Sequence, residues 1–202
     1  DDVVDIIREE AEHSMMSMAG LDDEADTFAP VLKSTQRRSI WLGVNLITAL
    51  MAVAVSSMFE GILNQLAILA VLNSLVPSMG GVAGNQTLTL VIRGMALGHV
   101  GESNSRILLY KELAIGFFNG LIWAVLIASV VAIWQQNLML GAIIAFAMLM
   151  NMTAAGIAGV TVPLMLKKMN IDPALAGSVI LTIVTDVVGI FAFLGTETLM
   201  LG

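Results

Sequence analysis

A long stretch without charge constrains this chain more than any other feature. Residues 113–166 contain no Asp, Glu, Lys or Arg. Over all 202 residues, hydrophobic residues make up 57% and charged residues only 12%, whereas a soluble domain has about 25% charged residues. A charged fraction of half that size is too small to cover a water-facing surface, so the composition excludes a soluble globular fold.

Five segments are long and apolar enough to cross a membrane, because a spanning helix needs about 20 mostly apolar residues. The uncharged stretch is too long for one crossing and divides at Gln135-Gln136-Asn137. The predicted spans are residues 39–58, 66–97, 108–134, 138–166 and 173–194. The sequence therefore predicts an all-α membrane protein with five transmembrane helices per chain.

The net charge of −7 is unevenly distributed along the chain. Residues 1–26 hold ten acids and one arginine, a sum of −9, and the remaining residues hold six acids and eight bases, a sum of +2. We expect residues 1–38 to form an acidic cytoplasmic connecting helix and linker, and residues 39–202 to form the membrane domain. Because the chain starts with Asp, we also expect a soluble N-terminal part of a longer protein to precede it.

The acidic leader has the spacing of an amphipathic helix, with Gly20 placed to cap its C-terminus. Its apolar residues at near-helical spacing are Val3, Ile6, Ile7, Ala11, Met15 and Met18. The other face carries acids and His13. Two interpretations stay open, a solvated linker and a cytoplasmic element that moves against the mouth of the membrane domain.

All the basic residues can be placed on one side of the membrane. They precede the first span, surround the connection between the second and third spans, and separate the fourth from the fifth: Arg8, Lys33, Arg37, Arg38, Arg93, Arg106, Lys111, Lys167 and Lys168. By the positive-inside rule, the N-terminus is expected in the cytoplasm and the C-terminus outside the inner (plasma) membrane. Membrane lipid is therefore an expected partner. The sequence lacks the excess of basic residues that would indicate nucleic-acid binding.

The second predicted span contains residues that disrupt a regular apolar helix. Pro77 lacks an N–H and its ring clashes with the preceding turn, so we expect the helix to bend or break there. Gly84, Asn85, Gln86 and Thr87 follow within the same span. Irregular backbone at membrane depth must be buried in protein or line a wet cavity. The segment is therefore either a polar path or a glycine-packed helix crossing.

The fifth span contains an acidic residue, Asp186, in the middle of its apolar sequence. Asp186 lies 13 residues beyond Pro173, which is roughly 20 Å into the membrane at about 1.5 Å per residue. A charged Asp at this depth costs about 2.5–3.5 kcal/mol, and no Lys or Arg lies at matching depth in another span. We expect its partner to be a mobile cation, a proton or water. The alternative is a neutral carboxyl that is hydrogen-bonded to Thr182 or Asn85.

The groups that could hold a cation here are all oxygen atoms. Ser178 and Thr182 share a helix face with Asp186, and the second span supplies amide and backbone carbonyls. Oxygen ligands suit hard cations such as Mg²⁺. One carboxylate per chain cannot neutralise a divalent ion, so charge balance favours a homodimer. Asp172, which precedes Pro173, is expected to cap the fifth helix and could also draw cations to the mouth.

The sequence gives little support to an enzyme. It has no Cys, which excludes thiolate zinc sites and thiol catalysis, and Asp186 has no histidine or second acid at matching depth. Isolated polar residues in the other spans, Asn45, Asn119, Asn151 and Thr153, are explained by hydrogen bonds between helices.

Two segments resemble the MgtE family of magnesium channels and transporters. Residues 77–98, PSMGGVAGNQTLTLVIRGMALG, are similar to its P-x-x-x-x-x-x-G-N-Q…R-G-x-A-x-G stretch, and LTIVTDVVGIFAFLG of the fifth span also resembles it. Val82 departs from the pattern, since the family often has Asn there. The resemblance covers roughly residues 1–200. It implies a homodimeric Mg²⁺-selective pore that is lined by spans two and five.

The resemblance also implies residue roles. Asp186 matches the family's Mg²⁺-binding aspartate, residues 84–86 match its pore-lining turn, and the leader resembles its plug-like connecting helix. The family's cytoplasmic sensing domains, an N-domain and a CBS pair, are absent from this sequence. The complete metal-site hypothesis comprises Asp186, Asn85, Gly84, Gln86, Ser178, Thr182 and Asp172.

The expected function is entry of Mg²⁺ into the cytoplasm down its electrochemical gradient. Membrane voltage supplies about 2.3 kcal/mol per elementary charge per 100 mV. In the intact protein, cytoplasmic Mg²⁺ is expected to gate the pore, which makes the ion both cargo and regulator. The alternative is a proton- or sodium-coupled secondary transporter, because broken helices and a mid-membrane Asp are equally typical of that class.

Overall fold

The computed structural model describes residues 5, 9, 12–13, 15–21, 28–65, 67–101 and 103–201. Within these residues the secondary structure is entirely helical. The helices are α2 (Val31–Ser57), α3 (Glu60–Gln65), α4 (Ala67–Leu72), α5 (Leu75–Ala96), α6 (Ser105–Gln135), α7 (Leu138–Lys168), α8 (Pro173–Ile190), the π-helical turn η1 (Phe191–Gly195) and α9 (Thr196–Leu201). Most of the acidic leader, including Arg8 and the apolar residues Val3, Ile6, Ile7 and Ala11, lies outside the described residues.

The prediction of five membrane spans is confirmed. Five helical segments are long and apolar enough to cross a membrane, and they are Val31–Ser57, Ala67–Ala96, Ser105–Gln135, Leu138–Lys168 and Pro173–Met200. The bounds differ most from the prediction at two places. The first helix begins eight residues earlier than residue 39, and the fifth continues beyond residue 194 to the end of the described chain. Residues 60–65, predicted as a plain connection, form the short helix α3.

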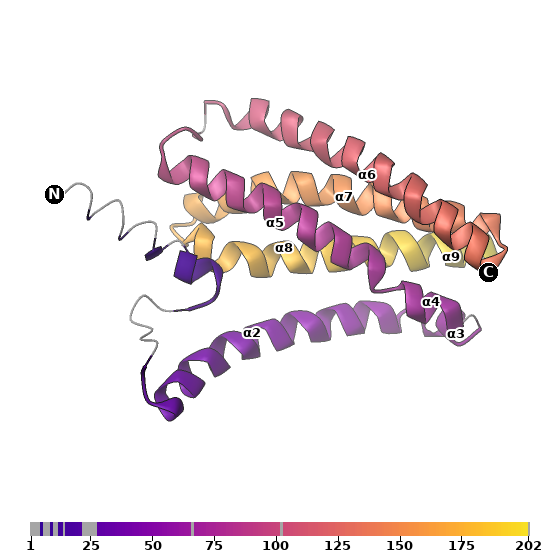
Figure 1. The fold of residues 1–202 in the computed structure, drawn as a ribbon, viewed down its shortest axis with the longest axis horizontal. Helices are drawn as coiled ribbons and strands as arrows, with labels where there is room; N and C mark the ends of the chain where they lie inside the picture. Colours follow the sequence, from indigo (N-terminus) through magenta and orange to yellow (C-terminus); the bar gives the residue numbers. More distant parts are fainter. Residues whose placement is uncertain are drawn as a thin grey trace.

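The long helices run side by side with α7 at the centre (Figure 1). α7 is the most buried of the five spans and α2 is the least buried. α6 packs along α7, α5 and α8 pack against α7 and against each other, and α2 lies beside α8. The described basic residues all belong to helix ends or loops at one end of this bundle, the left end in Figure 1. This arrangement is the one that the distribution of charge along the sequence predicts.

Glycines allow the helices to approach each other backbone to backbone. A Cβ atom added to Gly116 of α6 would lie 2.7 Å from the carbonyl oxygen of Met152 in α7. In the reverse direction, a Cβ on Gly156 of α7 would lie 2.7 Å from the carbonyl oxygen of Glu112 in α6. Small residues at such contacts are the usual means of helix association in lipid, where burial of apolar surface provides no driving force between helices.

The second span breaks before Pro77 rather than at it. α4 ends at Leu72, and α5 begins at Leu75 after the two-residue turn Asn73-Ser74. Pro77 is the third residue of α5, within the first helical turn. A proline is tolerated there because the first N–H groups of a helix have no partner within the helix. The predicted break therefore exists, but Pro77 follows it and stands at the start of the next helix.

The fifth span changes its helical geometry near its C-terminal end. After α8, residues Phe191–Gly195 form a π-helical turn, and α9 continues the same span. Phe193 and Leu194 of this turn are fully buried, and Glu197 of α9 is only 1% exposed. A π-turn inside a longer helix is rare and often accompanies a functional region.

Substitution of Gly116 by Ala should destabilise the fold. The added methyl group meets a backbone carbonyl that cannot move alone, and overpacking of this kind costs about 1–3 kcal/mol. Gly43 of α2 is the matched control, because an added Cβ has no neighbour within 4 Å. Thermal unfolding in detergent, followed by fluorescence-detected gel filtration, should show a lower midpoint for Gly116→Ala and no loss for Gly43→Ala. Equal midpoints would contradict the packing described for α6 and α7.

Candidate functional site

The predicted site residues of α5 lie on different faces of that helix. Gly84 is buried, whereas Asn85 and Gln86 are exposed. A Cβ on Gly84 would lie 2.9 Å from the Leu181 side chain of α8, and the carbonyl oxygen of Gly84 approaches Gly159 of α7. Gly84 therefore packs α5 against α7 and α8, as the glycine-crossing interpretation expects. The two amide side chains point away from this contact.

The predicted residues of α8 form a half-buried stripe beside its packed face. Leu181 and Thr185 are fully buried, and Ser178, Thr182 and Asp186 flank them with intermediate exposure. Thr182 donates its hydroxyl hydrogen bond to the carbonyl of Ser178 within the same helix, over 2.9 Å. The stripe runs along the membrane-spanning helix and carries a hydroxyl or carboxyl group at each turn.

The Asp186 carboxylate has no hydrogen bond or ion pair in the described part of the chain. The alternative in which Thr182 or Asn85 satisfies it is therefore not seen. α5 and α8 do lie side by side, since a Cβ on Gly81 would be 3.8 Å from the Thr185 hydroxyl. Asp186 is thus one residue from the α5 contact, but no bond joins it to Asn85 or Gln86.

The described part of the chain contains no complete carboxylate cage for a metal ion. Among the described residues, no three His, Asp or Glu side chains lie close enough to hold a metal ion together. Any cation at Asp186 must therefore keep water ligands, use carbonyl and hydroxyl oxygens, or meet a second copy of the chain. Mg²⁺ accepts the first of these arrangements readily, because it releases its water reluctantly.

Asp172 caps α8 as predicted. Its Oδ1 accepts a hydrogen bond from the amide of Ala174 over 2.9 Å, and Pro173 occupies the first position of the helix. Its Oδ2 lies 3.3 Å from Nε2 of His13 in the leader. This contact places a described part of the leader at the basic end of α8. Gly20, with φ of 70°, ends the leader's described helical turn, and Leu21 donates to the Met16 carbonyl there, as a helix C-cap requires.

The isolated polar residues of the other spans divide into two kinds. Asn151 of α7 is completely buried and donates a hydrogen bond from Nδ2 to the carbonyl oxygen of Val76 in α5 over 2.8 Å. The predicted bond between helices is confirmed there. The prediction of a hydrogen bond to another helix is wrong for Asn45 and Thr153. They donate to the carbonyls of Trp41 and Leu149 in their own helices.

Sequence reasoning missed two buried acids, Glu197 of α9, which is 1% exposed, and Glu112 of α6. Its Oε2 accepts a hydrogen bond from the hydroxyl of Thr87 in α5 over 3.0 Å, and the residue is only 3% exposed. Glu112 stands at the edge of the uncharged stretch beside Lys111, so from the sequence it belongs to a charged helix end. Glu112 directly precedes the uncharged residues 113–166, which places it at membrane depth. This position is the signal from which its burial could have been predicted.

Comparison with known proteins decides the family. The family model of MgtE, described as a divalent cation transporter, matches residues 73–196. This chain belongs to the MgtE family. It is 31% identical over 201 residues to the magnesium transporter MgtE of Enterococcus faecalis and 31% identical over 200 residues to that of Bacillus subtilis. The corresponding protein of Thermus thermophilus is 26% identical over 203 residues.

These matches cover almost the whole chain but less than half of each relative. They include 98% to 100% of this chain and 44% to 45% of the relatives. The chain therefore spans less than half the length of the curated MgtE proteins that it matches. The MgtE description and the relatives' names refer to transporters, which is a non-enzyme class.

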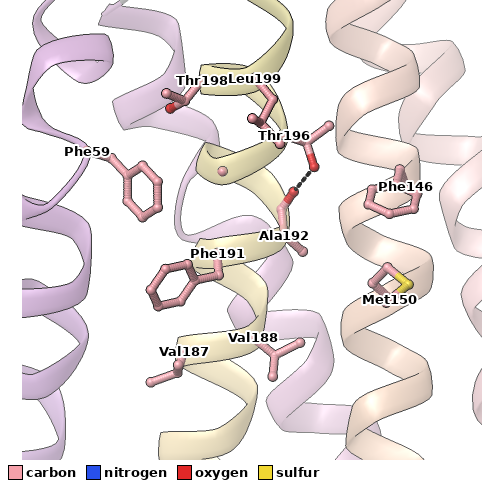
Figure 2. A pocket seen from close by; sticks show the side chains of 11 residues that line it. Phe59, Phe146, Met150, Val187, Val188, Phe191, Ala192, Thr196, Thr198 and Leu199 are labelled. Atoms are coloured by element: carbon pink, nitrogen blue, oxygen red, sulfur yellow. Dashed lines mark hydrogen bonds between the residues drawn. The ribbon is translucent and has the colours of Figure 1, made fainter.

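An apolar pocket of about 640 Å³ lies at the C-terminal end of α8 in this MgtE-family chain. In Figure 2, Val187 and Phe191 of the fifth span point to the side of Phe59, and Val188 points to the side of Phe146 and Met150 of α7. Phe59 meets Phe191 edge-on with ring centroids 5.5 Å apart. The polar hydroxyl of Thr196 is turned to the carbonyl of Ala192 over 2.7 Å. The lining offers few free oxygen atoms, so it does not extend the cation site.

Substitutions at Asp172 should separate its cap from its charge. Asn caps helices as well as Asp does, whereas Ala loses the cap at a cost of about 0.5–2 kcal/mol. We expect Asp172→Ala to lower the unfolding midpoint in detergent and Asp172→Asn to keep it. Ion uptake by the Asn variant then measures the charge alone. Equal midpoints for both variants would show that the cap contributes nothing to stability.

Proposed function

We propose that the chain forms the ion-conducting part of a Mg²⁺ transporter, with Asp186 as the cation-binding residue at mid-membrane depth. The observation that carries this proposal is the Asp186 carboxylate, which is half-buried in a spanning helix and has no partner in the described part of the chain. Such a charge is costly in the membrane, and a passing cation offsets that cost when it binds. The names of the MgtE relatives point to the same ion.

The polar stripe on α8 supplies further ligands for a hydrated divalent ion. Ser178, Thr182 and Asp186 present oxygen atoms on successive turns, and Asn85 and Gln86 extend outward from the adjacent helix α5. A largely hydrated Mg²⁺ needs few direct protein ligands and can bind these groups through its water molecules. Asp172 would concentrate cations at the start of the same helix while it caps α8.

A homodimer would complete the path. A single Asp186 carries one negative charge, and two copies related by a two-fold axis along the path would supply the two charges of a divalent ion. In one protomer the face of α5 with Asn85 and Gln86 is open, and α2 has little of its surface buried. Both surfaces are therefore available to a second copy.

Transport would be passive and directed inward. The basic end of the bundle would face the cytoplasm, so the inside-negative voltage would drive Mg²⁺ toward that end. The contact between His13 and Asp172 brings the leader to this end. In the intact protein, cytoplasmic Mg²⁺ bound between the acidic leader and sensing domains of the family's kind would hold the leader over the mouth. Low Mg²⁺ would allow the acidic surfaces to separate and open it.

Replacement of Asp186 by Asn should abolish most ion uptake. In liposomes with an internal Mg²⁺-sensitive dye and an inside-negative potential, we expect the rate to fall about tenfold or more, since each 1.4 kcal/mol of lost stabilisation is a factor of ten. Glu60→Gln is the control, because Glu60 is exposed in α3 outside the proposed path. Equal uptake by Asp186→Asn and the parent protein would refute the site.

The same liposomes distinguish a channel from a coupled transporter. At fixed voltage, Mg²⁺ uptake through a passive pore should not change when a proton or sodium gradient is imposed across the membrane. A rate that follows either gradient would favour the secondary transporter instead.

Single cysteines should report the orientation, because the native chain has none. Met58 is 70% exposed in the turn after α2, and Ser103 is exposed in the turn before α6. With a membrane-impermeant maleimide on intact cells, Met58→Cys should react at once and Ser103→Cys only after permeabilisation. The opposite pattern would place the basic end outside and reverse the proposed direction.

A further inference from the structure

Three helices of the bundle meet at a buried polar junction formed by Thr87, Glu112, Gly156 and Gly159. The Thr87 hydroxyl of α5 donates to Glu112 Oε2 of α6 over 3.0 Å. A Cβ on Gly159 of α7 would lie 2.7 Å from Cβ of Thr87, and one on Gly156 would lie 2.7 Å from the carbonyl oxygen of Glu112. Thr87 is therefore held between a carboxylate on one side and a glycine of α7 on the other.

Packing alone does not explain a glutamate at this position. Glu112 is 3% exposed, and its Oε1 has no hydrogen-bond partner. The nearest cation, Nζ of Lys111, is 3.9 Å from Oε1 and its side chain is 61% exposed. A buried carboxylate with incomplete hydrogen bonding is costly, and a Leu or Met would fill the same volume without that cost.

The junction fixes the rotation of α5 about its own axis. Thr87 and Val76 are 11 residues apart, which is about three helical turns, so they share one face. Asn151 holds Val76 at one end of this face, and Glu112 holds Thr87 at the other. Asn85 precedes Thr87 by two residues and so points about 200° away from it. The hydrogen bonds of Val76 and Thr87 on the inner face of α5 therefore determine the direction in which Asn85 points on its outer face.

We propose that Glu112 is a positioning residue for ion transport, because its bond to Thr87 holds α5 in the rotation that presents Asn85 and Gln86 to the ion path. This inference rests on the proposed function. It concerns a residue that cannot touch the ion itself, since Glu112 is enclosed among α5, α6 and α7 on the side of α5 that points away from Asn85.

The role of the hydrogen bond can be separated from the role of the charge. Glu112→Gln keeps an acceptor oxygen for Thr87 but removes the charge, and Glu112→Ala removes both. Thr87→Ser keeps the hydroxyl donor, whereas Thr87→Val keeps the shape of the side chain and removes the hydroxyl donor. We expect Glu112→Gln and Thr87→Ser to retain Mg²⁺ uptake within twofold of the parent, and Glu112→Ala and Thr87→Val to lose at least fivefold. The double variant Glu112→Ala/Thr87→Val should lose no more than either single variant.

A chemical readout that does not depend on uptake reports the rotation directly. In the Cys-free chain, Thr89→Cys lies on the exposed face of α5 and Leu88→Cys on its buried face. With a water-soluble maleimide in liposomes, the parent background should label at residue 89 and hardly at residue 88. Glu112→Ala should slow labelling at residue 89 at least threefold and raise it at residue 88. Glu112→Gln should change neither rate.

Each failure has a distinct meaning. Unchanged labelling at both positions in Glu112→Ala, with a labelled parent, would overturn the positioning role and leave the Asp186 path intact. Equal losses of uptake in Glu112→Gln and Glu112→Ala would also overturn it, because the charge and not the bond would then matter. No labelling at residue 89 in the parent would refute the water-filled path along α5 and the positioning role with it. Gel filtration in detergent confirms that each variant is folded before either measurement.

Discussion

Close contact between helix backbones is the interaction on which the rest of this structure depends. Lipid provides no hydrophobic driving force between helices, so association must come from packing and from polar contacts. Gly116 and Gly156 place the backbone of α6 against that of α7 in both directions, and Gly141 repeats the contact against the carbonyl oxygen of Ala128 near the C-terminal end of α6. The α6–α7 pair is therefore a firm support, and Gly84 and Gly159 attach α5 to the same support.

On this support, the polar side chains fall into two groups. Those of the inner group are bonded within the protein: Asn151 to the Val76 carbonyl, Thr87 to Glu112, and Thr185 to carbonyls of its own helix. Those of the outer group, among them Asn85 and Asp186, keep their polar atoms free of such bonds in the described part of the chain. Because unsatisfied polar atoms are costly in a membrane, we propose that the exposed outer group faces water, an ion or a second copy of the chain.

The sequence predicts the spans well because length and apolar composition decide them locally. It predicts the consequence of Pro77 less well, since a proline is compatible with both a break and a helix start, and the turn Asn73-Ser74 settles which one occurs. Asp186 and the Asp172 cap can be found from position alone. The pairing of Glu112 with Thr87 cannot, because the residues are 25 apart in sequence and their contact depends on how α5, α6 and α7 cross. The same reason explains Asn45 and Thr153, whose bonding partners depend on which helix faces them.

The π-helical turn at Phe191–Gly195 has a consequence for every residue beyond it. A π-turn holds one more residue than an α-turn, so the phase of α9 is offset by about one residue from that of α8. Phe193 and Glu197 follow Thr185 at multiples of four residues and are buried as it is, although at the 3.6-residue period of a regular α-helix Glu197 would lie about 120° from Thr185 around the axis. The fifth span thus consists of two helical segments whose faces are out of register, and the polar stripe of Ser178, Thr182 and Asp186 belongs only to the first.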